Sequence, residues 1–118
     1  MVNMKMVCKI WLDNNGKAFG EGPYELLHYI EKTGSLHQAA IEMGLSYRKA
    51  WMILKKSEER LGFPLLERKK GGRAGGGSKI TPYGIKFMKR YEQFHKEAET
   101  VLKEIYNKYF EDTLTSDH

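Results

Sequence analysis

Basic side chains gather in one part of this chain of 118 residues. Between residues 44 and 80 there are ten Lys or Arg residues against three acidic ones, a net charge of +7, whereas the whole chain carries +5. The remaining residues therefore sum to −2. Positive charge focused in this way is typical of a surface that binds a polyanion such as nucleic acid. An isolated basic run is more often only a solvated face, so the elements that hold these charges decide the interpretation.

A helix-turn-helix pattern holds the first half of this charge. Ser35 is a good N-cap, because its hydroxyl can accept a hydrogen bond from a first-turn N–H. Apolar and small side chains then recur at helical spacing: Leu36, Ala39, Ala40 and Met43. Gly44 follows, where the chain must turn sharply and a left-handed residue is needed. Ser46 predicts the N-cap of a second helix, whose core face consists of Ala50, Ile53, Leu54, Ser57 and Leu61.

The opposite face of the second helix has the composition of a DNA-reading surface. We expect contacts with DNA from Ser46, Tyr47, Arg48, Lys49, Met52, Lys55 and Lys56. Arg48 lies in the first turn, and a guanidinium can bond both major-groove acceptors of guanine, so Arg48 is the expected specificity residue. Tyr47 either contacts a phosphate or a thymine methyl, or closes the turn. Trp51 is expected to be partly buried at the edge of the helix.

A glycine-rich basic loop follows between two strand-like runs, residues 65–68 and 79–81. Residues 69–78 contain five of the 12 glycines of the chain, so this loop gains order mainly by lying against another surface. The pattern predicts the wing of a winged helix, set on phosphates or in a minor groove. The residues expected to contact the DNA backbone come from the wing and from the first helix of the helix-turn-helix. They are His37, Gln38, Lys69, Lys70, Arg73 and Lys79.

These segments resemble two families of bacterial regulators. Residues 34–68 are similar to the amino-terminal winged helix of LysR-type regulators. A closer resemblance, over roughly residues 5–110, is to the DNA-binding domain of the molybdate-responsive ModE-type regulators. Its motifs are Gly-Leu-Ser-Tyr-Arg-Lys-Ala-Trp at 44–51, Leu-Glu-Arg at 66–68, Gly-Gly-Arg-Ala-Gly-Gly-Gly at 71–77 and Thr-Pro-Tyr-Gly at 81–84. The resemblance implies DNA binding. ModE-type regulators hold molybdate in carboxy-terminal domains, and this chain stops at His118, so we expect neither direct molybdate binding nor a cofactor.

The amino-terminal part predicts a short β-hairpin. Residues 7–12 alternate, with Cys8, Ile10 and Leu12 on one face, as in a half-buried strand. Asn14-Asn15-Gly16 is a turn signal, and residues 17–20 form a second short strand. Cys8 is the single cysteine, so we expect it buried in the first strand, with no disulfide within one chain and no thiolate metal site. Gly22-Pro23 then begins a helix that ends at Thr33-Gly34.

Pro82 begins the last and longest helix, which we expect to reach about residue 110. Apolar residues recur along it at steps of three and four: Phe87, Tyr91, Phe94, Ala98, Val101, Leu102, Ile105 and Tyr109. A helix of this length extends ~40 Å, more than a domain of this size covers alone. We therefore expect a homodimer through this stripe, with the two recognition helices one DNA turn (~34 Å) apart. The alternative is a helix that folds back onto its own domain.

The predicted fold is mainly α with a small β-wing (α+β), a winged helix-turn-helix. We expect a strand or hairpin in residues 1–20 and the winged domain in 21–81, with the helix-turn-helix in 35–61 and the wing in 65–81. The dimerisation helix is expected in 82–110 and a tail in 111–118. The predicted function is that of a sequence-specific transcriptional regulator, a homodimer on an inverted repeat in double-stranded DNA, with the ModE resemblance implying a link to molybdenum. The alternative is a winged helix that binds a protein or a structured RNA.

Other classes of function are disfavoured. Ser78-Lys79 reverses the Lys-Ser/Thr order of a phosphate-binding P-loop, and the four histidines (28, 37, 95 and 118) lack metal-ligand spacing, so we expect neither an enzyme nor a metal site. No apolar run approaches ~18 residues and no signal peptide precedes residue 20, so we expect no membrane contact and a cytoplasmic protein.

Overall fold

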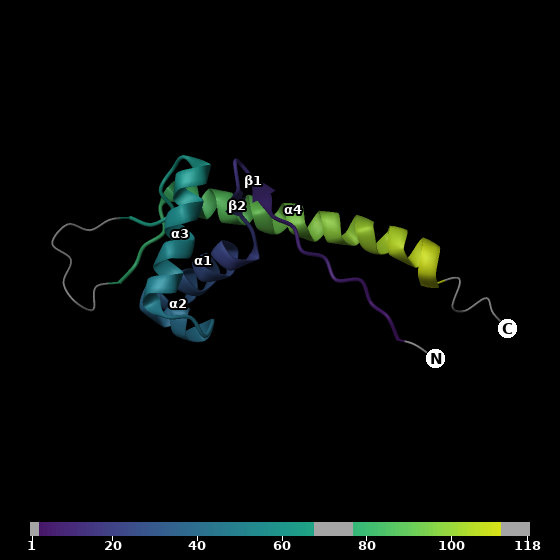
Figure 1. Ribbon diagram of the computed structural model, residues 1–118, viewed down its shortest axis with the longest axis horizontal. Coiled ribbons are helices and arrows are strands. Elements are labelled where there is room, and N and C mark those ends of the chain that lie inside the picture. The colour runs from purple at the N-terminus through teal and green to yellow at the C-terminus, as the bar shows by residue number, and fades with distance from the viewer. Residues whose placement is uncertain (1–2, 68–76, 112–118) are drawn as a thin grey trace.

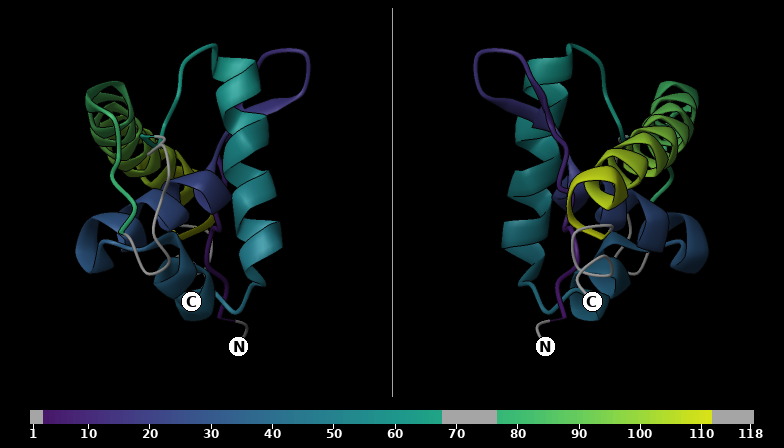
Figure 2. Two further views of the ribbon diagram at one scale, coloured as in Figure 1. Left: turned by 90° about the vertical axis from the view of Figure 1, so that its left-hand side faces the viewer. Right: turned by 90° about the vertical axis from the view of Figure 1, so that its right-hand side faces the viewer.

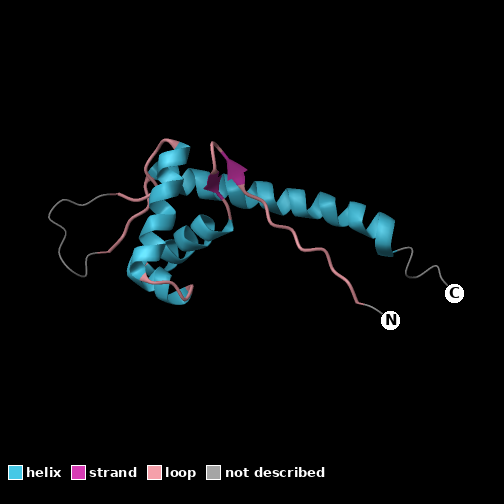
Figure 3. Cartoon of the chain, in the orientation of Figure 1, coloured by secondary structure: helices cyan, strands magenta, loops and turns pink. Residues whose placement is uncertain are grey.

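The computed structural model describes residues 3–67 and 77–111. A small antiparallel hairpin, β1 (Leu12–Asp13) and β2 (Lys17–Phe19), is followed by three helices, α1 (Glu21–Thr33), α2 (Leu36–Glu42) and α3 (Tyr47–Leu61). A long helix, α4 (Pro82–Tyr106), continues into a π-helical turn, η1 (Asn107–Glu111). Helices dominate and β structure is minor (Figures 1 and 3). The predicted fold class, mainly α with a small β component, is confirmed.

The hairpin is shorter than the sequence predicts. β1 covers only residues 12 and 13, because β2 has three residues and its pairing ends where Leu12 meets Phe19. The expected alternation is present, since Cys8 and Ile10 are half-buried, but residues 3–11 have no strand beside them within the described ranges. The prediction that Cys8 is buried in a strand is therefore wrong. A strand needs a hydrogen-bonding neighbour, whereas this segment packs on α4, where the Tyr91 hydroxyl donates to the Ile10 carbonyl at 2.6 Å.

The helix-turn-helix forms at the residues that the sequence predicts. Ser35 Oγ accepts a hydrogen bond from Gln38 N at 3.1 Å, and Ser46 Oγ accepts one from Lys49 N at 3.0 Å. Gly44 between the helices is left-handed, with φ of 68°. Leu45 N then donates to the carbonyl of Ala40 at 2.9 Å, which closes the turn. Local capping therefore sets the start of both α2 and α3.

The core lies where the hairpin, α1, α2, α3 and the first part of α4 meet. Phe19 of β2 is fully buried, and its ring contacts the edges of Phe87 and Tyr91 at centroid distances of 4.9 and 5.1 Å. The Ser57 hydroxyl of α3 donates to the carbonyl of Ala18, which ties α3 to the hairpin. Figure 2 shows α4 nearly end-on, with α3 to one side of it and α1 and α2 crossing below. The other buried apolar residues are Leu26, Leu27, Ile30, Leu36, Ala39, Ala40, Ala50, Leu54, Leu65, Ile80 and Met88.

α4 begins inside this core and leaves it. Thr81 caps the helix by accepting from Gly84 N at 2.9 Å, and Met88 and Tyr91 are buried. The last part of the helix projects away from α1, α2 and α3, and the amino-terminal segment lies on the same side of the molecule (Figure 1). None of the helices in the described ranges has the combination of length and apolarity that crossing a bilayer requires.

Candidate nucleic-acid interface

α3 separates a buried face from an open basic face. Ala50, Leu54 and Ser57 are buried against the hairpin and the other helices. On the opposite side Arg48, Lys49 and Lys56 are exposed, and none of the three has an ion-pair partner in the described part of the chain. The sequence-based division of this helix into two faces is therefore confirmed. Positive groups that are exposed and unpaired are available to an external anion.

The amino-terminal end of α3 lies beside α2. The rings of His37 in α2 and Tyr47 in α3 are 6.1 Å apart, so two of the expected DNA-contacting residues occupy one surface. Tyr47 is 51% exposed, which disfavours the alternative that it only closes the turn. Gln38 is half-buried, and its backbone N–H is bonded to Ser35.

Trp51 is partly buried at the edge of α3, as the sequence predicts. Its side chain is 39% exposed, and the ammonium group of Lys55 lies 6.0 Å from the ring centroid, within cation–π range. Met52 beside it is also exposed. The exposed parts of Trp51 and Met52 add apolar surface beside the basic residues of this face. The four-residue step from Trp51 to Lys55 is the sequence pattern that predicts contact between these two side chains on one face of the helix.

The base of the wing (residues 65–67 and 77–81) is less regular than the predicted pair of strands. In the part of these two runs that the structure describes, a single bridge forms, between Leu66 and Ile80. Glu67 N donates to the Lys79 carbonyl at 2.8 Å, and Thr81 N donates to the Leu65 carbonyl at 2.9 Å. Lys79 is exposed. Lys69, Lys70 and Arg73, which the sequence assigns to the wing, lie outside the described residues.

One basic residue of this region has a structural role. Arg60 Nη1 donates to the Lys17 carbonyl at 3.1 Å, and the Arg60 carbonyl accepts from Asn14 Nδ2 at 2.8 Å. Its guanidinium also lies against Gly16, where a Cβ would come within 2.5 Å of Arg60 Cζ. Arg60 therefore stabilises the hairpin turn, and its charge is not on the reading face.

The family described as "Bacterial regulatory helix-turn-helix protein, lysR family" matches residues 24–85, more than half of the chain. The chain belongs to this lysR family. Its match covers α1, the helix-turn-helix, the wing base and the start of α4.

The lysR-family domain of this chain is similar to the corresponding region of proteins named ModE and MopB. Molybdenum-pterin-binding protein MopB of Rhodobacter capsulatus is 39% identical over 80 residues, 68% of this chain and 30% of the relative. Molybdenum transport protein ModE of Azotobacter vinelandii is 32% identical over 103 residues, 86% of this chain and 38% of the relative. The DNA-binding transcriptional dual regulator ModE of Escherichia coli K12 is 34% identical over 82 residues, which are 67% of this chain and 31% of the relative. The chain thus spans about a third of the length of these relatives.

After residue 85, where the lysR-family match ends, one part of the apolar stripe of α4 is buried and the other part is exposed. Tyr91 is 4% exposed and Phe87 is half-buried, so both residues belong to the core of their own domain. The sequence-based expectation that they contribute to a dimer interface is therefore wrong. The reason is Phe19, whose ring occupies the space beside both of them. The exposed members of the stripe begin at Phe94 and continue with Val101, Leu102, Ile105 and Tyr109, with half-buried Ala98 among them.

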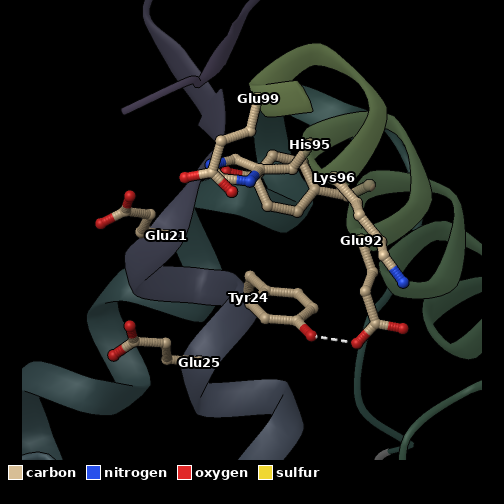
Figure 4. A pocket seen from close by; sticks show the side chains of 8 residues that line it. Glu21, Tyr24, Glu25, Glu92, His95, Lys96 and Glu99 are labelled. Carbon is tan, nitrogen blue, oxygen red and sulfur yellow. Dashed lines mark hydrogen bonds between the residues drawn. The ribbon is translucent and has the colours of Figure 1, made fainter. Parts of the chain in front are cut away.

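A cavity of about 370 Å³ lies between α1 and α4 (Figure 4). Aromatic side chains line it together with four carboxylates, those of Glu21, Glu25, Glu92 and Glu99. The Tyr24 hydroxyl donates to Glu92, and burial together with this bond raises the pKa of Tyr24 to about 12. Within the described ranges no three His, Cys, Asp or Glu side chains are placed to hold a metal ion. His95 and Lys96 also line the cavity, so its carboxylates outnumber its basic groups.

Proposed function

We propose that this lysR-family chain is a transcriptional regulator that binds an inverted repeat in double-stranded DNA as a homodimer. The observation that supports this most strongly is the basic face of α3 opposite its buried face, where Arg48, Lys49 and Lys56 are exposed and have no ion-pair partner among the described residues. A helix with one face packed in a core and the other open and basic fits the major groove, which admits an α-helix. This function requires access to the chromosome, so we place the protein in the cytoplasm.

The first turn of α3 is the proposed reader of base identity. Ser46, Tyr47 and Arg48 are exposed there, and Arg48 is proposed to bond guanine. Lys49, Lys55 and Lys56 are better suited to phosphates, because an ammonium is a point charge without the fork geometry of a guanidinium. We propose that His37, Gln38, Lys69, Lys70, Arg73 and Lys79 contact the DNA backbone. Of the four wing residues in this set, only Lys79 lies within the described residues. Met52 is proposed to lie against base edges.

The proposed homodimer forms through the exposed part of the α4 stripe. A shallow groove of about 740 Å³ lies along this face, lined by Arg90, Gln93, Phe94, Glu97, Ala98, Val101 and Leu102. Phe94 and Val101 are 49% and 54% exposed, an unfavourable state for large apolar side chains gathered on one face. The same stripe on a second copy would cover them, because a two-fold axis presents the same surface on both subunits.

The names of the Rhodobacter capsulatus and Azotobacter vinelandii relatives refer to molybdenum. We propose that the genes under control of this chain are linked to molybdenum, and that residues 1–118 bind their operator without binding molybdate. The acidic lining of the cavity between α1 and α4 supports the second statement. Operator affinity should then be the same with and without added molybdate. A shift in affinity with molybdate would contradict this part of the proposal.

Selection of bound sequences from a random DNA pool tests the main proposal, because it yields the half-site and the spacing of the repeat. If 6 to 10 phosphates are neutralised per dimer, a rough estimate, affinity falls by about 10³ to 10⁵ between 50 and 200 mM salt. Binding that does not change with salt, or equal binding to duplex RNA, would refute a major-groove reader.

Two substitutions test the proposed roles on the selected site. Arg48→Ala should cost roughly 1–3 kcal/mol and relax sequence preference, whereas Lys79→Ala should weaken binding to all sequences alike. Equal losses on selected and random DNA for Arg48→Ala would show that another residue reads the site.

A further inference from the structure

Glu58 joins the base of the wing to the recognition helix. This residue lies in the last part of α3, and its Oε2 accepts hydrogen bonds from the backbone N–H groups of Leu65, at 2.7 Å, and Leu66, at 3.1 Å. One carboxylate oxygen therefore holds two successive amides of the outgoing wing strand. Charge-assisted bonds of this kind are roughly twice as strong as neutral ones. The start of the wing is thus attached directly to the helix that carries Arg48.

Ser78 makes the corresponding attachment on the returning strand. Its Oγ accepts from the N–H of Leu36, the first residue of α2, at 2.9 Å, and its own N–H donates to the Gly34 carbonyl at 2.7 Å. At Gly77 a Cβ would lie 2.8 Å from the same carbonyl oxygen, so the two backbones are in contact. The returning strand is thereby held against the junction between α1 and α2.

Apart from the contacts at Glu58 and Ser78, the polar contacts of the wing base within the described residues do not reach α2 or α3. Thr81 Oγ1 donates to the Pro64 carbonyl at 2.7 Å, and the bridge between Leu66 and Ile80 joins the two strands to each other. Within residues 3–67 and 77–111, side-chain hydrogen bonds from the wing base to the helix-turn-helix are therefore those at Glu58 and Ser78. Each strand of the wing base has one such attachment, and the two attachments come from different helices.

We propose that Glu58 and Ser78 are positioning residues for DNA binding, which set the wing base at a fixed place relative to the first turn of α3. This inference rests on the proposed function. If the wing and α3 are already in register before DNA arrives, the entropy cost of arranging them is not incurred on binding, and affinity rises. Neither residue offers a positive charge to DNA. Glu58 is negative, so electrostatics alone predict that removal of its charge strengthens binding, whereas the positioning role predicts the opposite.

The pair Glu58→Ala and Glu58→Gln separates the hydrogen bonds from the charge. Both substitutions remove the same negative charge, but only glutamine keeps a side-chain oxygen able to accept from Leu65 N and Leu66 N. We expect Glu58→Ala to bind the selected DNA about tenfold more weakly than the wild type, the scale set by two lost backbone hydrogen bonds. Glu58→Gln should bind as tightly as the wild type or more tightly. Glu59→Ala is the matched control, because Glu59 is the neighbouring exposed carboxylate and has no bond to the wing base in the described residues.

The salt dependence of affinity distinguishes positioning from a general loss of stability. A misplaced wing makes fewer phosphate contacts, so the slope of log affinity against log salt should be shallower in Glu58→Ala. A folded variant with intact contacts would keep the wild-type slope. Ser78→Ala should also bind more weakly and with a shallower salt slope, on selected and random DNA alike. Ser78→Thr keeps a hydroxyl, so it should have the affinity and the salt slope of the wild type.

Circular dichroism and thermal unfolding identify the variants that are folded at the assay temperature. If Glu58→Ala does not fold, the comparison of Ser78→Ala with Ser78→Thr decides. Folded Glu58→Ala and Ser78→Ala proteins with wild-type affinity and slope would overturn the positioning role and leave the proposed function intact. Equal losses in Glu58→Ala and Glu58→Gln would also overturn it for Glu58. A wild-type protein that binds no duplex DNA would instead overturn the proposed function itself, and this inference with it.

Discussion

Tyr91 and Phe94 lie three residues apart on the apolar stripe of α4, yet Tyr91 is 4% exposed and Phe94 is 49% exposed. Tyr91 packs on Phe19 and donates a hydrogen bond to the Ile10 carbonyl, so it joins α4 to both the hairpin and the amino-terminal segment. The point between these two residues is where α4 leaves the core. Residues before it stabilise the protomer, and exposed residues after it are available to a second copy.

This division predicts different effects of truncation on stability. Tyr91→Ala should lower the free energy of unfolding by roughly 3–5 kcal/mol, because it empties a buried aromatic site and leaves the Ile10 carbonyl without its donor. Phe94→Ala should change it by only about 0.5 kcal/mol, as expected for an exposed position. Urea unfolding measures both, in a Val101→Glu background so that dimerisation does not contribute. Similar losses for the two variants would contradict the division.

The proposed dimer predicts that one charge within the exposed stripe produces monomers. Val101→Glu should shift the protein from dimer to monomer, because each two-fold contact would bury a carboxylate in an apolar seam. Thr100→Glu introduces the same charge at an exposed position outside the stripe and should remain dimeric. Sedimentation equilibrium gives the masses. The circular dichroism spectrum of Val101→Glu should show the helix content of a folded protein. A wild-type protein that is already monomeric would refute the dimer.

The turn between α2 and α3 predicts a cost for any side chain at Gly44. Its φ of 68° lies in the left-handed region, so Gly44→Ala should destabilise the protein by about 1–2 kcal/mol although nothing lies within 4 Å of the added Cβ. Gly22→Ala is the matched control, because its Cβ is equally unobstructed and α1 is right-handed there. That variant should be up to about 1 kcal/mol more stable than the wild type. Thermal unfolding compares them, and equal effects would show that backbone conformation does not decide the outcome.

The cavity between α1 and α4 predicts a loss of stability at high pH. Burial, and then the hydrogen bond to Glu92, raises the pKa of Tyr24 from 10.0 to about 12, so the folded protein holds this proton more tightly than the unfolded chain does. The resulting stabilisation is complete below pH 10 and is lost as the pH rises from 10 to about 12. Burial also raises the pKa of Tyr91, which adds a dependence of the same sign.

Tyr24→Phe isolates the contribution of Tyr24. The unfolding temperature of the wild type should fall between about pH 9.5 and 11.5, and that of Tyr24→Phe should fall less, with the remainder due to Tyr91. The two curves should approach each other as the pH rises. Parallel curves would show that the Tyr24 proton is not coupled to folding.

Features set within a few residues of chain could be predicted from the sequence. The caps at Ser35 and Ser46 and the left-handed Gly44 all lie where the pattern places them, because each depends on a hydroxyl or a missing Cβ acting on backbone no more than four residues away. The two faces of α3 follow from helical periodicity for the same reason. Charge count and these elements together were sufficient to predict a DNA-binding winged helix.

Contacts between distant segments were decided only by the tertiary structure. Spacing shows that α4 has an apolar stripe, but the position of the Phe19 ring determines that Phe87 and Tyr91 are covered within the protomer. Residues 7–11 have the alternation of a strand, but the three residues of β2 leave them no partner to pair with. Ser78 and Leu36 lie 42 residues apart, and no local pattern reveals that a wing residue bonds the first N–H of α2. The sequence by itself determined which elements form, since their hydrogen bonds are local, whereas packing determined which of their faces remain open to DNA or to a second copy.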